Sequence, residues 1–133
     1  MSHTASAQGQ STRVLLIDDE PDVCAAYSML LDMEGMEVMT ALNGKDGLIK
    51  AKSRVPDVVI CDYMMPGMDG LAVCRAIRSD DTLRNVTIIL WSAARGVDAG
   101  GFADLTIEKP VHIDSFVQVI QESIARRRAG PTE

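Results

Sequence analysis

The chain is poor in aromatic and histidine residues and has no long apolar run, and each shortage excludes a class of structure. The longest apolar stretch, residues 86–91, has the length of a strand and falls far short of the roughly 20 residues of a membrane-spanning helix. Residues 1–10 contain no apolar block, which predicts a loose tail and not a signal peptide. His3 and His112 have no partner pattern, so neither is predicted to bind a metal.

Positive charge is also scarce, because 13 basic residues face 19 acidic ones and leave a net charge of −6. This balance argues against nucleic-acid binding by the domain. The basic cluster Arg126–Arg128 closes a helical pattern, where cations favour the helix dipole. Cys24, Cys61 and Cys74 lack metal-type spacing and lie in apolar segments. We therefore expect buried, reduced thiols in a cytoplasmic protein.

Short apolar runs rich in β-branched residues alternate with helical patterns along the chain. The predicted strands cover residues 14–17, 38–41, 58–61 and 86–91, with a weaker one at 105–107. Helices are predicted after Pro21, over residues 43–53, after Gly70 and over residues 113–124. The helix at 43–53 is the weaker one, with Leu48, Ile49 and Lys52 as its best-placed residues. The alternation with short connections predicts an α/β fold with a parallel sheet.

The segment between Ser92 and Lys109 is short and contains Gly96, Gly100 and Gly101, so a helix there would be short or distorted. We expect one domain over residues 12–128. Disordered tails are expected at 1–11 and at 129–133, the second being either an end or the start of a linker.

Residues with chemical potential follow the predicted strands. Asp18 and Asp19 follow the first strand, Asp62 ends the third, Ser92 follows the fourth and Lys109 follows the fifth. The carboxyl ends of parallel strands meet at one edge of a sheet, so these side chains are expected to lie together. Two like charges 4 Å apart repel by about 4 kcal/mol at an effective dielectric constant near 20. The three carboxylates therefore need a cation or a retained proton among them.

This set of residues suits phosphoryl chemistry. Carboxylates without soft ligands favour Mg²⁺, and the compact ammonium of Lys109 suits a phosphate oxygen. An aspartate can act as a nucleophile and form an aspartyl phosphate, and Ser92 offers a hydroxyl hydrogen bond. Neutralising and orienting charge in this way is nearly all that phosphoryl transfer requires.

Four blocks of sequence resemble the receiver domain of response regulators in two-component signalling: Val14–Pro21, Cys61–Gly70, Leu90–Ala93 and Glu108–Pro110. The resemblance spans residues 12–128. It implies the chemotaxis-regulator-like fold, a single doubly wound five-stranded sheet of order 2-1-3-4-5 with helices on both faces. It also implies a cytoplasmic switch in a phosphorelay, which is not a conventional enzyme and catalyses only its own phosphorylation and dephosphorylation.

The resemblance implies a role for each matching residue. Asp62 is the implied phosphoacceptor, supplied by a histidine kinase or a histidine phosphotransfer protein. Asp19, Asp62 and the backbone carbonyl of Met64 would bind Mg²⁺ directly, and Asp18 would do so through water. Downstream, an unidentified protein partner is expected, with neither nucleic acid nor membrane bound by the domain, which would be a monomer or a weak dimer.

On the phosphoryl side, the resemblance gives Ser92 the switch hydroxyl, pairs Lys109 with the phosphoryl group and makes the Lys109–Pro110 bond cis. Thr106 stands where the family usually carries an aromatic residue on the last strand. With the short segment before it, this departure predicts a different output surface. Met64 and Ala94 resemble positions that tune hydrolysis, and neither orients water, so a long-lived phosphoryl group is expected.

Simpler interpretations stand beside these. Asp18 to Glu20 could cap a helix, and Met64, Met65 and Met68 are read as packing residues. Trp91 is read as a core or near-site residue without a chemical role, able to report Mg²⁺ by fluorescence. A phosphohydrolase of the haloacid-dehalogenase type needs an Asp-x-Asp arrangement, whereas Asp18 and Asp19 are adjacent. A pseudo-receiver that only binds a partner is the third reading.

Overall fold

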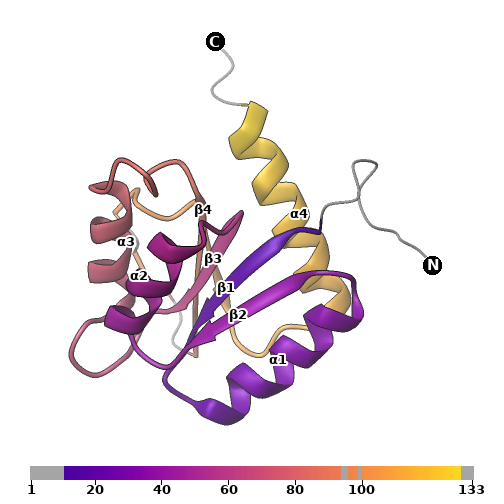
Figure 1. The fold of residues 1–133 in the computed structure, drawn as a ribbon. Helices are drawn as coiled ribbons and strands as arrows, with labels where there is room; N and C mark the ends of the chain where they lie inside the picture. Colours follow the sequence, from indigo (N-terminus) through magenta and orange to yellow (C-terminus); the bar gives the residue numbers. More distant parts are fainter. Residues whose placement is uncertain (1–10, 94–95, 99, 130–133) are drawn as a thin grey trace.

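The computed structural model describes residues 11–93, 96–98 and 100–129 and has one parallel sheet of order β2-β1-β3-β4-β5 (Figure 1). The strands are β1 (Arg13–Ile17), β2 (Glu37–Ala41), β3 (Val58–Asp62), β4 (Thr87–Ser92) and β5 (Leu105–Glu108). The helices are α1 (Pro21–Met33), α2 (Gly44–Ser53), α3 (Gly70–Arg78) and α4 (Ile113–Ala129). The predicted sheet and strand order are confirmed. The tails expected at 1–11 and 129–133 lie largely outside the described residues.

Helices cover both faces of the sheet, with α2 and α3 on one side and α1 and α4 on the other (Figure 1). Alternate residues of each strand enter the two cores, so that Leu15 and Ile17 of β1 face α2 and α3 while Val14 and Leu16 face α1 and α4. A strand buried on both faces reads as a continuous apolar run, which is why the sequence revealed β1, β3 and β4 most clearly. Within the described residues, no helix is both long and apolar enough to cross a membrane.

Small residues form the buried face of α2. The helix begins after Asn43, whose side chain accepts a hydrogen bond from the Asp46 N–H at 2.8 Å, and its buried residues are Gly44, Gly47 and Ala51. Ile49 is 58% exposed and Lys52 is also exposed, while Leu48 is half-buried. A Cβ on Gly47 would lie 2.4 Å from Ile17 Cδ1, so the helix approaches the sheet through its glycines. Apolar periodicity cannot detect such an approach.

The connection between β4 and β5 contains no helix among its described residues, 93, 96–98 and 100–104. Gly96, Gly100 and Gly101 have φ values of 70°, 60° and 83°, in the left-handed region that a right-handed helix cannot use. Phe102 and Ala103 pack against the core under α2 and α3 in place of a helix. The glycines thus explain why the helix expected to be short or distorted does not form in the described part.

The three cysteines are buried and free, as predicted. Burial raises the pKa of the Cys61 thiol well above its ordinary value and, as the main cause, raises that of Cys74 to about 11. Thiols in this state are mostly protonated near neutral pH and serve as packing groups.

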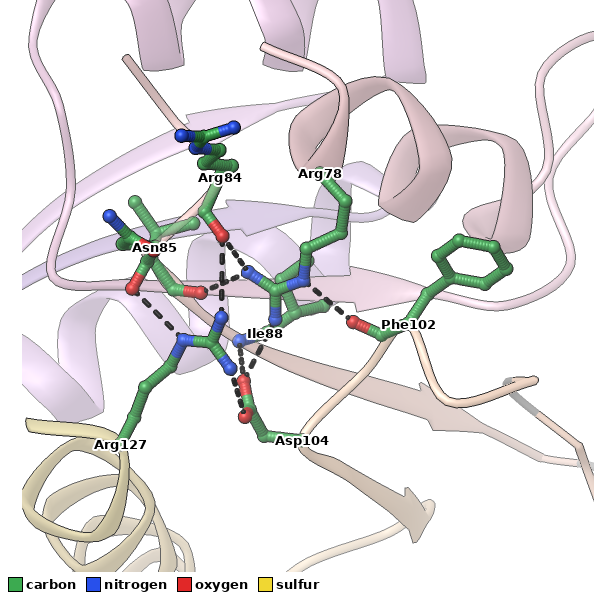
Figure 2. A network of polar contacts seen from close by, with 8 residues as sticks. Arg78, Arg84, Asn85, Ile88, Phe102, Asp104 and Arg127 are labelled. Atoms are coloured by element: carbon green, nitrogen blue, oxygen red, sulfur yellow. Dashed lines mark hydrogen bonds and ion pairs between the residues drawn. The ribbon is translucent and has the colours of Figure 1, made fainter. Parts of the chain in front are cut away.

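A polar network ties the ends of α3 and α4 to the start of β5 (Figure 2). The Asp104 carboxylate accepts hydrogen bonds from Arg78 Nη2 at 3.1 Å, Arg127 Nη1 at 2.8 Å and the Ile88 N–H at 2.8 Å. The same guanidinium groups donate to the carbonyls of Arg84, Asn85, Val86 and Phe102. The C-terminal arginines therefore do more than favour the helix dipole. Arg127 also links α4 to the amino edge of the sheet, through Asp104 and the carbonyls of Arg84 and Asn85.

Candidate functional site

The carboxyl edge of the sheet brings three aspartates together. Ile17 pairs with Cys61 in the register, so Asp18 lies beside Asp62, the last residue of β3. Asp18 and Asp62 are buried and Asp19 is half-buried. One carboxylate oxygen of each residue lies within 4.8 Å of the other two. The acidic cluster predicted from the order of the strands is present.

Lys109 connects two of these carboxylates. Its Nζ lies 2.7 Å from Asp18 Oδ2 and 3.6 Å from Asp62 Oδ2, and its side chain is only 16% exposed. The Lys109 N–H donates to the Ser92 carbonyl at 2.8 Å, which fixes the end of β5 against β4. The Lys109–Pro110 bond is cis, as the resemblance implied.

Backbone groups orient the same carboxylates. The Glu20 N–H donates to Asp18 Oδ1 at 2.9 Å, and the Met64 N–H donates to Asp62 Oδ1 at 3.3 Å. The N-cap of α1 is Glu20, which makes no side-chain capping bond. Side-chain capping of α1, one part of the simpler interpretation of this acidic run, is therefore not found at its N-cap.

The electrostatics of Asp62 reflect its crowding. Burial is the largest influence and raises the pKa of its carboxyl from 3.8 to about 6. The Lys109 ammonium lowers this pKa and the charges of Asp18 and Asp19 raise it. For Lys109 itself, burial opposes the charged form, but the hydrogen bond that its ammonium donates to Asp18 and the charges of the nearby carboxylates raise its pKa overall. One ammonium is outweighed by three carboxylates, and the cluster still attracts positive charge.

The donor set fits a hard divalent cation. The cluster offers carboxylate oxygens from Asp18, Asp19 and Asp62 and contains neither thiol nor imidazole ligands. Oxygen-only sets of this kind suit Mg²⁺, which demands few protein ligands and keeps several waters. The residues present therefore fit the metal that the sequence predicts.

The remaining predicted residues differ in position and in exposure. Ser92 is the last residue of β4 and is buried. The Met64 side chain is 65% exposed, which makes its reading as a packing residue wrong. Met65 is buried, and Met68 packs beside Gly44, as expected. Thr106 lies on β5 opposite Leu90.

One neighbour of the site was underestimated from sequence. The Lys109 Nζ lies 4.8 Å from the centre of the Trp91 ring, and Trp91 is fully buried. Trp91 pairs with Asp62 across β3 and β4. The sequence did contain one signal, because Trp91 directly precedes Ser92. The register of β3 and β4 then puts Trp91 beside the end of β3.

The strand order and the acidic cluster at the carboxyl edge define a doubly wound α/β domain of the receiver class. The chain matches the family model of the response regulator receiver domain over residues 14–121 and belongs to that family. Phosphorylation on an aspartate and dependence on Mg²⁺ are general in this family, whose members partner with histidine kinases in two-component systems.

Known relatives support this membership. The chain is 35% identical over 131 residues to the probable transcriptional regulatory protein TcrX of Mycobacterium tuberculosis, covering 95% of this chain and 54% of that protein. It is 38% identical over 105 residues to the transcriptional regulatory protein AfsQ1 of Streptomyces coelicolor, covering 74% of this chain and 44% of the relative. The chain spans about half the length of these curated relatives.

Solved structures give the same fold. The response regulator TrrA of Thermotoga maritima, in complex with Mg²⁺-BeF, is 33% identical with a TM-score of 0.75, covering 84% of this chain and 97% of that one. A receiver domain protein of Clostridium thermocellum is 26% identical with a TM-score of 0.79, covering 89% and 98%.

Proposed function

We propose that Asp62 accepts a phosphoryl group from a histidine kinase or a histidine phosphotransfer protein, and that this modification switches the binding of a downstream partner. The observation that carries the proposal is the cluster of Asp18, Asp19 and Asp62 with Lys109 between two of its carboxylates. Membership of the receiver family supports the same assignment.

Oxygen atoms of Asp18, Asp19 and Asp62 and the backbone carbonyl of Met64 are the groups that would hold Mg²⁺. We assign direct contacts to Asp19, Asp62 and Met64, and a water-mediated contact to Asp18. When bound, Mg²⁺ supplies positive charge that offsets the charge on the phosphoryl oxygens. The carboxylate-only cluster supports this choice of metal.

In the transfer step, an Asp62 carboxylate oxygen attacks the phosphorus atom on the donor histidine. The P–N bond breaks, its electron pair returns to the imidazole, and a P–O bond forms to Asp62. Lys109, now 2.7 Å from Asp18 and 3.6 Å from Asp62, would pair with an incoming phosphoryl oxygen. Ser92 would donate its hydroxyl to another oxygen. Water later attacks the phosphorus atom, the P–O bond to Asp62 breaks, and inorganic phosphate leaves as the carboxylate is regenerated. The chain would catalyse only these two changes to itself.

Mass spectrometry after incubation with acetyl phosphate and Mg²⁺ tests the acceptor. We expect a single added phosphoryl group that maps to Asp62 and is absent in Asp62→Asn. Asp22→Asn is a matched control, because it removes an exposed acid in the first turn of α1. Labelling of Asp62→Asn at the wild-type rate would remove Asp62 from this role. Profiling against candidate histidine kinases would then identify the natural donor.

We infer that the output surface differs from that of receivers with a full helix between the last two strands. Thr106 on β5 and the glycine-containing connection before it support this inference. Amide hydrogen exchange with and without beryllofluoride tests it. We expect ligand-dependent protection outside the connection, and strong protection confined to residues 93–104 would contradict the inference.

We also propose a cellular location, a domain range and an oligomeric state from the chain's own properties. The net charge of −6 and the buried free thiols support a cytoplasmic domain, spanning residues 12–128, that contacts proteins and not nucleic acid or membrane. We propose a monomer or weak dimer, which sedimentation velocity with and without beryllofluoride can measure.

A further inference from the structure

Trp91 lies between Lys109 and the core. It is the only tryptophan of the chain and the residue before Ser92 at the end of β4. In the register it pairs with Asp62 on one side and with Ile107 on the other, so it lies between the end of β3 and the strand that leads to Lys109. The Lys109 Nζ accordingly lies 4.8 Å from the ring centre.

Two further aromatic rings fix the orientation of the indole. The Phe116 ring of α4 stacks on it, with centroids 5.3 Å apart and planes inclined by 13°. The Tyr27 ring of α1 meets it edge-on, with centroids 4.9 Å apart and an angle of 82°. Trp91 is fully buried by these neighbours, so its ring cannot turn away from Lys109 without disturbing two helices.

The contact between Lys109 and Trp91 has the geometry of a cation–π interaction. A lysine within about 6 Å of an indole centre is attracted by the negative face of the ring, more strongly where water is excluded. Lysine carries a flexible four-carbon stem and loses substantial rotamer freedom when its ammonium is fixed. A rigid ring beside the ammonium reduces the number of positions that the ammonium can occupy.

We propose that Trp91 is a positioning residue that holds the Lys109 ammonium at the level of the Asp62 carboxylate, ready to pair with a phosphoryl oxygen. The proposal rests on the proposed function of Asp62. A residue that only fills the core would stabilise the fold without affecting phosphoryl binding. A positioning residue changes the affinity for a phosphoryl group, and does so only while Lys109 is present.

Calorimetric titration with beryllofluoride in the presence of Mg²⁺ tests the proposal. Trp91→Leu keeps an apolar side chain of smaller volume and removes the aromatic face, and we expect about tenfold weaker binding. Trp91→Phe keeps a weaker aromatic face and should lose less. Ile120→Ala removes packing from the same core without touching Lys109 and should stay within about twofold of the wild type. Equal affinities in Trp91→Leu, Ile120→Ala and wild type would overturn the proposal.

A double-mutant cycle separates positioning from general damage. In the Lys109→Met background, Trp91→Leu should cause no further loss of beryllofluoride affinity, whereas the same loss in both backgrounds would overturn the proposal.

A readout without metal comes from the indole itself, because Lys109→Met should change the fluorescence emission of Trp91 in EDTA. Unchanged emission counts against the contact. If the wild type neither binds beryllofluoride nor is labelled on Asp62, the proposed function fails instead.

Discussion

Asp62 is kept in an environment that disfavours its charge. Burial and two neighbouring carboxylates raise its pKa, and the single ammonium of Lys109 only partly offsets them. A buried charge that is unfavourable for stability is expected at a functional site, where residues are selected for function. The cost at this residue should therefore be measurable as stability gained when the charge is removed.

Asp62→Asn is expected to stabilise the metal-free protein near neutral pH. The pKa of about 6 in the folded state exceeds the ordinary value of 3.8, so the folded protein binds more protons than the unfolded one between these values. The favourable contribution of the carboxyl is complete below pH 3.8 and is lost as the pH rises through about 6. Removing the charge should gain about 1–3 kcal/mol at pH 7.5 and little at pH 4.

Urea denaturation in EDTA at the two pH values measures this difference. Asp22→Asn, on the exposed face of α1, is the control and should leave stability nearly unchanged at both. An Asp62→Asn variant that is less stable than the wild type at pH 7.5 would show that the pairing with Lys109 outweighs the cost of burial.

Residues beside Asp62, the proposed acceptor, are expected to set the phosphoryl lifetime. Met64 follows Asp62 by two positions and exposes its side chain to solvent, while Ala94 lies outside the described residues. Neither side chain can orient an attacking water. Substituting a polar pair, Met64→Asn with Ala94→Gln, should therefore accelerate dephosphorylation, as followed by the decay of the labelled protein. An unchanged decay rate would remove these positions from the control of lifetime.

The junction of β3 and α3 depends on a glycine. A Cβ on Gly70 would lie 2.6 Å from the Asp62 carbonyl oxygen and 2.8 Å from Tyr63 Cα, and backbone atoms cannot yield as side chains do. Gly70→Ala should destabilise the fold by about 1–3 kcal/mol and slow the labelling of Asp62, because the helix start must move away from the strand end. Denaturation and acetyl phosphate labelling measure the two effects.

Gly35→Ala provides the matched control, because Gly35 has a φ of 87° in open space at the end of α1, away from the carboxyl edge. It should lose stability through backbone strain and retain labelling. Equal labelling rates in the two variants would mean that the close approach at Gly70 does not position Asp62.

The ends of α3 and α4 share the Asp104 carboxylate (Figure 2). Asp104→Asn leaves the guanidinium groups of Arg78 and Arg127 without their shared counter-charge, so we expect a loss of about 1–3 kcal/mol in the free energy of unfolding. Labelling of Asp62 should be unaffected because the network lies at the opposite edge of the sheet. Increasing salt should reduce the difference in the free energy of unfolding between variant and wild type. A loss below about 0.5 kcal/mol would show that the network contributes no more than exposed surface ion pairs do.

The elements that sequence predicted well are those whose signal is local. Continuous apolar runs revealed the strands, and acids directly after them placed Asp18 and Asp62 at one edge. The misjudged features depend on residues distant in sequence. The network of Arg127 and Asp104 joins residues 23 positions apart, and the contact of Lys109 with Trp91 appears only once β4 and β5 are in register.

Across the whole molecule, the two edges of the sheet differ in their charged groups. The carboxyl edge concentrates acids around Asp62, whereas Arg78, Arg127 and Arg128 make ion pairs at the amino edge. Repulsion at one edge is thus separated from the pairs that fasten helix ends at the other. We therefore expect cation binding at the carboxyl edge to leave the ion pairs at the ends of α3 and α4 in place.

Mg²⁺ is accordingly expected to stabilise the whole domain by binding the folded state alone. A free concentration ten times the dissociation constant should add about 1.4 kcal/mol to the free energy of unfolding. Asp19→Asn should lose most of this gain and Asp22→Asn should keep it. The gain should shrink as the pH falls below about 6, because protons then compete for Asp62. Thermal unfolding across a Mg²⁺ series at pH 7.5 and pH 5 measures these differences, and an equal gain in wild type and Asp19→Asn would place the ion outside the acidic cluster.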